Sequence, residues 1–287
     1  MSEFKKRMES YRRHPGSFLL FLLVMLSALT TFVVLLFLIA YILIKGVPNL
    51  KPSLFAWKYT TDNASMLPSI INTLIMTVMS LLLAVPFGTF SAIYLTEYAK
   101  KGNKLVGIIR LTTETLSGIP SIVYGLFGSL FFVTYLKWSY SLAAGALTLA
   151  IMILPLVMRT TEEALKSVPD MYREGSFGLG AGKLRTVFCV VLPSAIPGIL
   201  SGVILSIGRI VGETAALIYT AGSIPQIPSS IMGSGATLAV HMYNLSKEGL
   251  YTDQAYAVAV VLLLLVLLIN WVSSRIGSVL CHSNSAE

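Results

Sequence analysis

The side chains best placed to bind a ligand are an arginine and a glutamate inside a long apolar stretch. Arg209 and Glu213 are four residues apart within residues 194–220, which are otherwise mostly small or apolar. In an α-helix this spacing places both side chains on one face, where opposite charges can pair. A charge at the bilayer centre costs about 2.5 to 3.5 kcal/mol on insertion scales, so an intramembrane arginine is a functional candidate by default.

A guanidinium in such a stretch is suited to binding an anion. Its planar fork makes paired, charge-assisted hydrogen bonds with a tetrahedral oxyanion, and a nearby glutamate can orient it and weaken the attraction enough for release. Arg209 follows Ser194 by roughly 22 Å of helix, which lies beyond the membrane centre toward the outer side. We predict a substrate pathway that contains Arg209, Glu213 and Thr214. The alternative is a structural ion pair that locks the helices together.

A polar, glycine-rich segment between two apolar stretches is the second candidate. Pro169 can start a helix with Glu174 in its first turns, and the glycines at 178–182 allow a sharp reversal into a second helix over 183–191. A Walker P-loop is excluded because it requires a glycine where this chain has Phe177, and no strand precedes the glycines as a dinucleotide site requires. The pattern predicts two short helices at an angle, forming a rigid knob outside the membrane. The alternative is an ordinary connecting loop.

A third element opens another apolar stretch and contains Glu114, Gly118, Pro120 and Ser121. Proline lacks a backbone N–H, so Pro120 and the glycines near it are expected to bend a helix and free backbone groups that neighbours or water must satisfy. We take these four residues as candidates for the pathway or its packing. A kink that serves packing alone is the simpler account.

Residue types that perform catalysis or hold metals are sparse and scattered. The three histidines, His14, His241 and His282, lack metal-ligand spacing, and no Ser-His-Asp set or carboxylate pair is arranged for hydrolysis. Cys189 and Cys281 have no cysteine near them in sequence, so a disulfide framework is not expected. We predict a chain that is not itself an enzyme and holds no metal or cofactor.

Composition places the chain in a membrane. Of its 287 residues, 55% are hydrophobic and 12% charged, and the mean hydropathy is +0.78, outside the range of soluble domains. About 20 apolar residues in a helix cross the hydrocarbon core. Six stretches qualify: Phe18–Ile44, Ile70–Leu95, Leu116–Leu136, Ser141–Met158, Ser194–Thr220 and Tyr256–Ile276.

The basic residues predict how these spans are oriented. The net charge of +8 lies in short runs beside the apolar stretches, which indicates membrane orientation rather than nucleic-acid binding. Fifteen Lys and Arg residues fall on the side that holds both termini and the Glu174 segment, and five fall on the other side. Because the positive side faces the cytoplasm, both termini and the Glu174 segment are predicted to be cytoplasmic. The connection 221–255 is then external, with an amphipathic helix over Thr237–Lys247.

The Glu174 segment resembles the loop with which permeases of ABC importers bind their ATPase. That family pattern is Glu-Ala-Ala, three residues, Gly, nine residues, Ile, one residue and Leu-Pro. The matching positions here are Glu174, Gly175, Ser176, Gly180, Val190, Leu192 and Pro193. The two alanines are replaced by glycine and serine, which keep the small size but have weaker helix propensity.

Two further runs, Gly118-Ile-Pro-Ser121 and Arg209-Ile-Val-Gly-Glu-Thr214, resemble permeases of the high-affinity phosphate ABC importer, and the likeness extends from Ile70 onward. Residues 237–243 are more similar to the A-type than to the C-type subunit. The resemblance implies an all-α integral membrane protein with the type I ABC-importer permease fold and six transmembrane helices. Its organisation would be an N-terminal segment, 1–69, and a permease domain, 70–280, with a coupling loop at 159–193.

The same resemblance implies partners and a location. A C-type permease, two copies of an ATPase that binds the ATP, and an external phosphate-binding protein would assemble with this chain in the cytoplasmic membrane of a bacterium or archaeon. Molybdate, tungstate or sulfate remain alternative substrates, because these anions share shape and charge with phosphate. A proton- or sodium-coupled carrier is a further alternative, disfavoured because only Glu213 lies deep in a span and because of the cytoplasmic knob.

Overall fold

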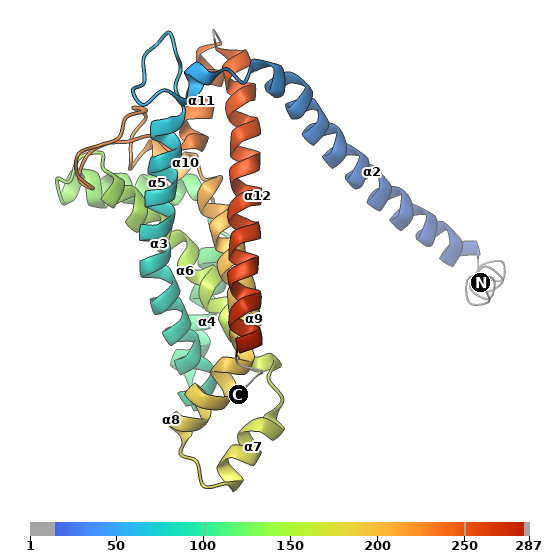
Figure 1. Ribbon diagram of the computed structural model, residues 1–287. Helices are drawn as coiled ribbons and strands as arrows, with labels where there is room; N and C mark the ends of the chain where they lie inside the picture. Colours follow the sequence, from blue (N-terminus) through green and yellow to red (C-terminus); the bar gives the residue numbers. More distant parts are fainter. Residues whose placement is uncertain (1–14, 101, 250, 284–287) are drawn as a thin grey trace.

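The computed structural model describes residues 15–100, 102–249 and 251–283, and within these ranges the regular structure is helical (Figure 1). The α-helices are α2 (Pro15–Gly46), α3 (Leu67–Ile93), α4 (Lys104–Ser117), α5 (Ser121–Gly128), α6 (Leu142–Ser167), α7 (Asp170–Gly178), α8 (Lys183–Thr186), α9 (Leu192–Val211), α10 (Ala215–Ile218), α11 (Leu238–Glu248) and α12 (Thr252–Ser283). π-helical turns over Tyr94–Tyr98, Ser129–Tyr135 and Val187–Val191 extend α3, α5 and α8.

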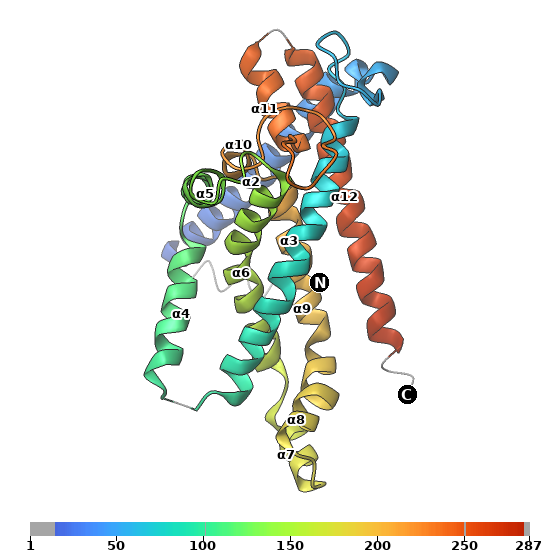
Figure 2. The same cartoon turned by 90° about the vertical axis from the view of Figure 1, so that its left-hand side faces the viewer.

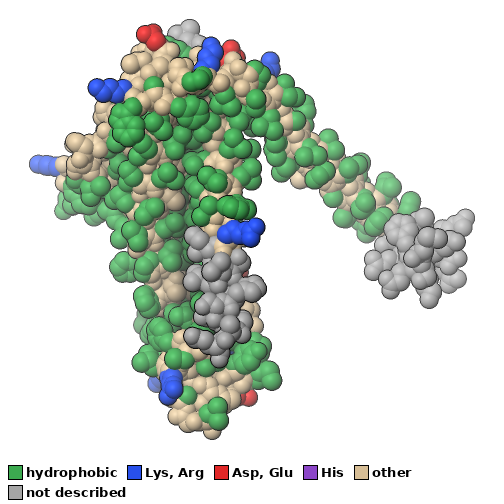
Figure 3. Space-filling view, viewed as in Figure 1, with side chains coloured by type: hydrophobic (Ala, Val, Ile, Leu, Met, Phe, Trp, Pro, Cys, Tyr) green, Lys and Arg blue, Asp and Glu red, His purple; other side chains and the backbone are tan. Residues whose placement is uncertain are grey.

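Helix α6 is the centre of the bundle, and it packs mainly against α3 and α9. Its most apolar stretch is 72% buried, compared with 33% for the equivalent stretch of α3. Small residues allow the close approach: a Cβ at Gly198 would lie 2.6 Å from the Ala164 Cβ, and one at Gly202 would collide with Thr160. Hydrophobic side chains cover the flanks of the bundle and α2 (Figure 3), as a membrane environment requires.

The six predicted spans correspond to five long apolar helices and one bent helix pair among the described residues, and two of the six differ in form from the prediction. Five helices are long and apolar enough to cross a membrane, and a sixth span exists if α4 and α5 are counted together. The prediction of a single helix over Leu116–Leu136 is wrong, because α4 and α5 meet at 101°. Pro120 explains the break, since it cannot donate a backbone hydrogen bond and it restricts the residue before it. The expected bend at Pro120 is therefore present.

The fifth predicted span, Ser194–Thr220, is also interrupted. Helix α9 ends at Val211, and after Gly212 and Glu213 the short helix α10 begins at Ala215. Glycine has low helix propensity, and the Glu213 carboxylate accepts a hydrogen bond of 3.1 Å from the Ala216 backbone N–H. That bond satisfies one of the free N–H groups at the start of α10 and favours a new helix over the continuation of α9.

A compact cap lies at the end of the bundle opposite α7 and α8 (Figures 1 and 2). We use the name cap for residues 47–66 together with α11, which confirms the helix predicted over Thr237–Lys247. Leu54, Met66 and Leu238 are at most 2% exposed and form its core with side chains of α12. The Thr73 hydroxyl accepts a 2.9 Å hydrogen bond from the Leu238 N–H, which joins α3 to the start of α11.

His241 is buried in this cap. Its ring lies edge-on to Tyr59, and its Nε2 is 3.3 Å from the Ala64 carbonyl oxygen. Burial lowers the pKa of His241, and the hydrogen bond to Ala64 only partly opposes that shift. The imidazole is therefore neutral in the folded cap near pH 7, whereas an unfolded histidine takes up a proton as the pH falls through about 6.5.

We expect acid to destabilise the cap through His241. Because the folded pKa is depressed, the unfolded state binds more protons below about pH 6.5, so stability is complete above that pH and is lost as the pH falls toward the lowered pKa. Thermal unfolding followed from pH 7.5 to 5.5 should show a smaller decline for His241→Gln than for the original chain. Both proteins retain His14 and His282, so equal declines would contradict this role.

Candidate functional site

The glycine-rich segment forms a protrusion that extends beyond the ends of the membrane helices (Figure 1). We use the name protrusion for residues 168–191. Val168 and Pro169 are extended and end α6, α7 follows, and Gly180 reverses the chain with a φ of +83°. The Gly180 N–H donates to the Phe177 carbonyl at 2.9 Å. The predicted knob is therefore present.

The second helix of the knob differs from the prediction in one respect. It is not a separate short helix, since Lys183–Val211 forms one continuous helical span. The turn before Pro193 is the π-helix, which is where the missing proline N–H removes a regular hydrogen bond. Leu192 and Pro193 thus lie at the start of α9, where the protrusion enters the membrane helix. A displacement of α8 would therefore be passed directly to α9, because the two form one continuous helical span.

Helices α7 and α8 are joined to each other but expose most of their surface. The Ser176 and Thr186 hydroxyl oxygens are 2.9 Å apart, whereas Glu174 and Gly175 are exposed. Several apolar side chains are also uncovered: Leu179 is 91% exposed, Met171 69% and Leu184 66%. Apolar side chains exposed on a polar protrusion are available for contact with another protein.

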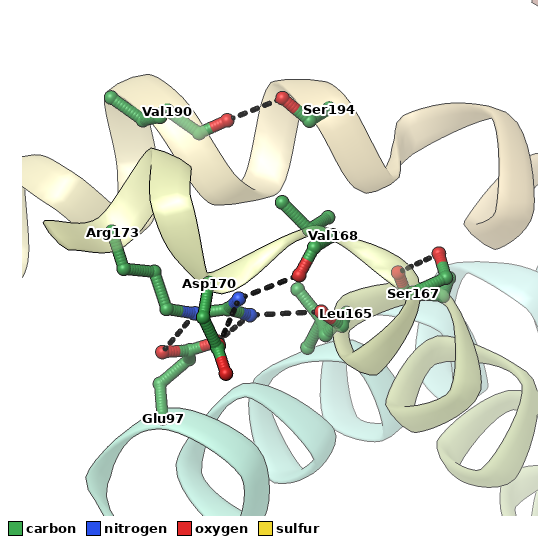
Figure 4. Close-up of polar contacts among 9 residues, drawn as sticks. Glu97, Leu165, Ser167, Val168, Asp170, Arg173, Val190 and Ser194 are labelled. Atoms are coloured by element: carbon green, nitrogen blue, oxygen red, sulfur yellow. Dashed lines mark hydrogen bonds and ion pairs between the residues drawn. The ribbon is translucent and has the colours of Figure 1, made fainter. Parts of the chain in front are cut away.

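The protrusion is held to the bundle by Arg173, which the sequence reading did not single out (Figure 4). Its guanidinium donates to the Glu97 carboxylate, with Nη2 to Oε1 at 2.8 Å and Nε to Oε1 at 3.2 Å. It also donates to the backbone carbonyls of Leu165 at 2.9 Å and Val168 at 2.8 Å, and Asp170 lies at 3.1 Å. The side chains of Arg173 and Glu97 are 15% and 9% exposed.

This arrangement uses most of the hydrogen-bonding capacity of a planar guanidinium. The hydrogen bonds that Arg173 donates to Glu97, followed by the charges of Glu97 and Asp170, raise the pKa of Arg173 above its usual range, so the group stays cationic. Glu97 belongs to the end of α3, and the carbonyls belong to the end of α6 and the following turn. One side chain of α7 therefore connects the protrusion to two membrane helices.

Apolar packing supports the same junction. Val187 and Val191 of the protrusion are at most 1% exposed, and they cluster with Ala92, Ile93 and Leu165 at the ends of α3 and α6. An ion pair and a hydrophobic cluster thus meet at the root of the protrusion. The tip is left free for a partner.

Arg209 lies where a groove enters the bundle between α6, α9 and α12. The groove has a volume of about 580 Å³ and is lined by Leu156, Ser201, Ile204, Leu205, Gly208, Arg209 and Asn270. Arg209 is half-buried there. The alternative of a structural ion pair between Arg209 and Glu213 is wrong: within the described part of the chain Arg209 makes no ion pair, and Glu213 caps α10 beyond the end of α9. The break after Val211 explains why the spacing of four residues did not bring them together.

Asn270 is a second polar group of this groove that the sequence reading missed. Its side-chain oxygen is buried without a hydrogen-bond partner among the described residues, and an unpaired buried polar atom is costly. A single asparagine inside the apolar run of α12 was the available signal. The groove therefore combines a guanidinium with an amide oxygen in apolar surroundings.

The helix break at Pro120, which the sequence indicated, and the break after Val211, which it did not, lie side by side. Helix α5 packs on α10, and Gly125 is required there because a Cβ would lie 2.7 Å from the Ala216 Cα. This contact joins α10, which follows Glu213 and Thr214, to α5, which begins at Ser121 directly after Gly118 and Pro120. The Tyr124 hydroxyl donates to the Leu116 carbonyl at 2.8 Å and so satisfies a backbone group freed by the break.

Glu114 is separated from these residues. It lies on α4 and lines a small pocket with Arg110, Arg159 and Glu162, toward the protrusion end of α4 and α6. The four candidates of the third element are thus divided between a charged pocket and the helix break.

The described chain is a bundle of helices that are long and apolar enough to cross a membrane, with an exposed protrusion at one end. The fold is found in solved ABC transporters. A bacterial alginate ABC transporter, solved with a periplasmic protein bound to an alginate pentasaccharide, has a TM-score of 0.66, with 16% identity and coverage of 93% of this chain and 98% of that chain. The MetNI methionine ABC transporter in an inward-facing conformation has a TM-score of 0.58, with 23% identity and coverage of 74% and 93%.

Residues 84–280 match the family model described as binding-protein-dependent transport system inner membrane component, and the chain belongs to this family. A probable ABC transporter permease, YqgI of Bacillus subtilis, is 35% identical over 87% of this chain and 91% of its own. The phosphate transport system permease protein PstA of Pasteurella multocida is 37% identical over 79% and 81%. PstA 2 of Mycobacterium bovis is 36% identical over 80% and 81%. The chain is thus a multi-pass inner-membrane permease subunit, and it works with a separate ATPase and a substrate-binding protein.

We expect Gly180→Ala to weaken attachment of the ATPase to this permease. A left-handed conformation costs a non-glycine residue roughly 1 to 2 kcal/mol, so the substitution should disturb the reversal that presents the exposed side chains. Gly178→Ala is the matched control, because it lies at the end of α7 with open space around its Cβ and without a positive φ. Co-purification of the ATPase should fall for Gly180→Ala alone, and equal yields for both variants would contradict the prediction.

Proposed function

We propose that this chain is the A-type permease of an ATP-driven, binding-protein-dependent importer of inorganic phosphate. Support for the substrate comes from relatives named as phosphate permeases that are 36% and 37% identical over about four fifths of the chain. A guanidinium in a membrane groove is the structural observation that carries the proposal, because phosphate requires charge-assisted donors in place of its hydration shell.

In this proposal Arg209 binds the anion during passage. An intramembrane arginine faces a bundle interior or a water-filled cavity, and the groove of Arg209 is open on one side within this subunit. A second permease that covered the groove would convert it into an enclosed pathway. Asn270 and Ser201 line the same groove and offer further polar contacts. Glu213 and Thr214, at the adjacent helix break, would set the shape of the outer part of this route.

Helix α2 supports assembly with another membrane subunit. Its apolar residues are exposed along its length, with 0% of its most apolar stretch buried, and it leans away from the bundle (Figure 1). Its contacts with α12 lie near its end, where the Tyr41 and Tyr256 rings are 5.8 Å apart. We propose that α2 packs against a C-type permease subunit and that lipid covers the remaining surface of α2.

The energy would come from a dimer of ATPase subunits that binds ATP, so this chain would need no cofactor of its own. The exposed side chains of Leu179, Met171 and Leu184 offer the protrusion's contact surface, and Glu174, Gly175, Ser176 and Gly180 form its frame. An external phosphate-binding protein would deliver substrate at the cap. This arrangement requires the protrusion and both termini to face the cytoplasm, and α12 indeed ends on the side of the protrusion (Figure 1).

We expect Arg209→Gln to reduce uptake of labelled phosphate by about 30-fold or more. The loss of charge-assisted hydrogen bonds removes about 2 kcal/mol, and 1.4 kcal/mol corresponds to a factor of ten. Binding-protein-dependent uptake by the reconstituted complex measures the effect, with molybdate and sulfate as competitors. Arg209→Lys, which keeps the charge but not the fork, should retain an intermediate rate.

Assembly is the control, since the Gln variant should co-purify with its partners at the normal yield. Normal uptake by Arg209→Gln would refute the role of this guanidinium. If unlabelled molybdate or sulfate inhibited uptake of labelled phosphate as strongly as unlabelled phosphate does, another oxyanion would be favoured as the substrate.

A further inference from the structure

A second charged pocket lies away from the Arg209 groove, at the protrusion end of the bundle. It has a volume of about 780 Å³ and lies between the end of α3, the α3–α4 connection, the start of α4, the end of α6 and the start of α7. Its charged lining residues are Glu97, Lys100, Lys104, Arg110, Lys166, Asp170 and Arg173. Five of these seven residues are basic. The pocket shares no lining residue with the Arg209 groove.

The acidic residues of this pocket are already occupied. Glu97 and Asp170 both contact Arg173, at 2.8 and 3.1 Å. Just outside the lining, one oxygen of Glu162 lies 2.7 Å from Arg110 and 2.6 Å from Lys166. These two contacts are ionic and lie off hydrogen-bonding directions. Glu162 thus faces two cations at once, and the local charge remains positive.

Lys100 and Lys104 have no ion-pair partner among the described residues. Both are exposed and stand on either side of the turn that begins α4, where the Asn103 side chain already caps the helix by accepting from the Leu105 N–H at 3.0 Å. In the same pocket the Thr96 hydroxyl oxygen is buried without a hydrogen-bond partner within the described chain. Two exposed ammonium groups that make no ion pair among the described residues therefore line this cavity together with Thr96.

The surroundings of the pocket are amphipathic. Leu105, Ile108 and Leu111 of α4 are 66%, 58% and 65% exposed, and helical spacing places Ile108 and Leu111 on the face of Lys104. Figure 2 shows α4 at the edge of the bundle, connected to α3 at its lower end. A ligand with an anionic group in the pocket and an apolar chain along α4 would match both features.

We propose that this pocket binds a phosphate group. The oxyanion accepts from Lys100 and Lys104, and Arg110 and Lys166 add attraction beyond what Glu162 neutralises. Two sources carry this chemistry: the headgroup of an anionic phospholipid in the cytoplasmic leaflet, and free phosphate in the cytoplasm. Basic pockets between membrane helices on the cytoplasmic side are suited to lipid headgroups, and the apolar flank of α4 fits the lipid source. The site does not depend on which substrate the transporter carries.

Binding of each source is measured on the assembled membrane complex in a neutral detergent, without the external binding protein, which would itself take up orthophosphate. Native mass spectrometry compares phosphatidylglycerol with phosphatidylcholine, and equilibrium dialysis measures labelled orthophosphate. All proteins carry Arg209→Gln, so that an anion in the groove does not contribute. The test variant is Lys100→Gln with Lys104→Gln. The matched control is Lys51→Gln with Lys58→Gln, which removes the same charge from exposed lysines in the cap.

One charge near an anionic surface changes affinity by roughly fivefold, so the test variant should bind the occupying anion roughly 20- to 30-fold more weakly. Lys100→Arg with Lys104→Arg should retain binding, and the control should bind like the parent. Selective loss of phosphatidylglycerol identifies a lipid site, and selective loss of orthophosphate identifies a soluble-anion site. The proposal would be overturned if the test variant bound both phosphatidylglycerol and orthophosphate as tightly as the parent, or if the cap control lost as much binding as the test variant.

Discussion

The ion pair between Glu97 and Arg173 is the interaction on which the mechanical account depends. It joins the protrusion to the end of α3, while the same guanidinium holds two carbonyls at the end of α6. Loss of one partner of a buried pair leaves an uncompensated charge, which costs about 3 to 5 kcal/mol. The pair need not add much net stability over an apolar contact. Its value lies in fixing one orientation of α7 relative to the membrane helices.

Helices α6 and α9 extend this connection into the membrane. The protrusion packs against α6 near Leu165, and Leu156 of the same helix lines the groove of Arg209. From α8 the chain continues without a break into α9, which carries Arg209 near its far end. Movement at the protrusion can therefore reach the groove through two packed helices. The adjacent breaks at Pro120 and Gly212 lie beyond the far end of this unit, where α5 packs on α10.

The sequence predicted the elements whose signals are local. Apolar length indicated the spans, Pro120 indicated the bend, and glycine spacing indicated the reversal at Gly180. Features set by distant contacts were not predictable in this way. Arg173 and Glu97 are 76 residues apart in sequence, and hydrophobic periodicity does not identify a pair at such a separation. The expectation that Arg209 and Glu213 could pair was wrong because it required a continuous helix. The capping of α10 by Glu213 favours a break instead. The roles of the pathway and coupling residues in transport remain predictions.

The most direct measurement is a double-mutant cycle on Glu97 and Arg173 in the reconstituted importer, with uptake per ATP hydrolysed as the readout. Glu97→Gln and Arg173→Gln should each lower that ratio. The double variant should be no worse than the worse single variant, because residues in one ion pair show a coupling energy of about 0.5 to 3 kcal/mol. Additive losses, or an unchanged ratio in both single variants, would contradict the claim that this pair transmits the stroke.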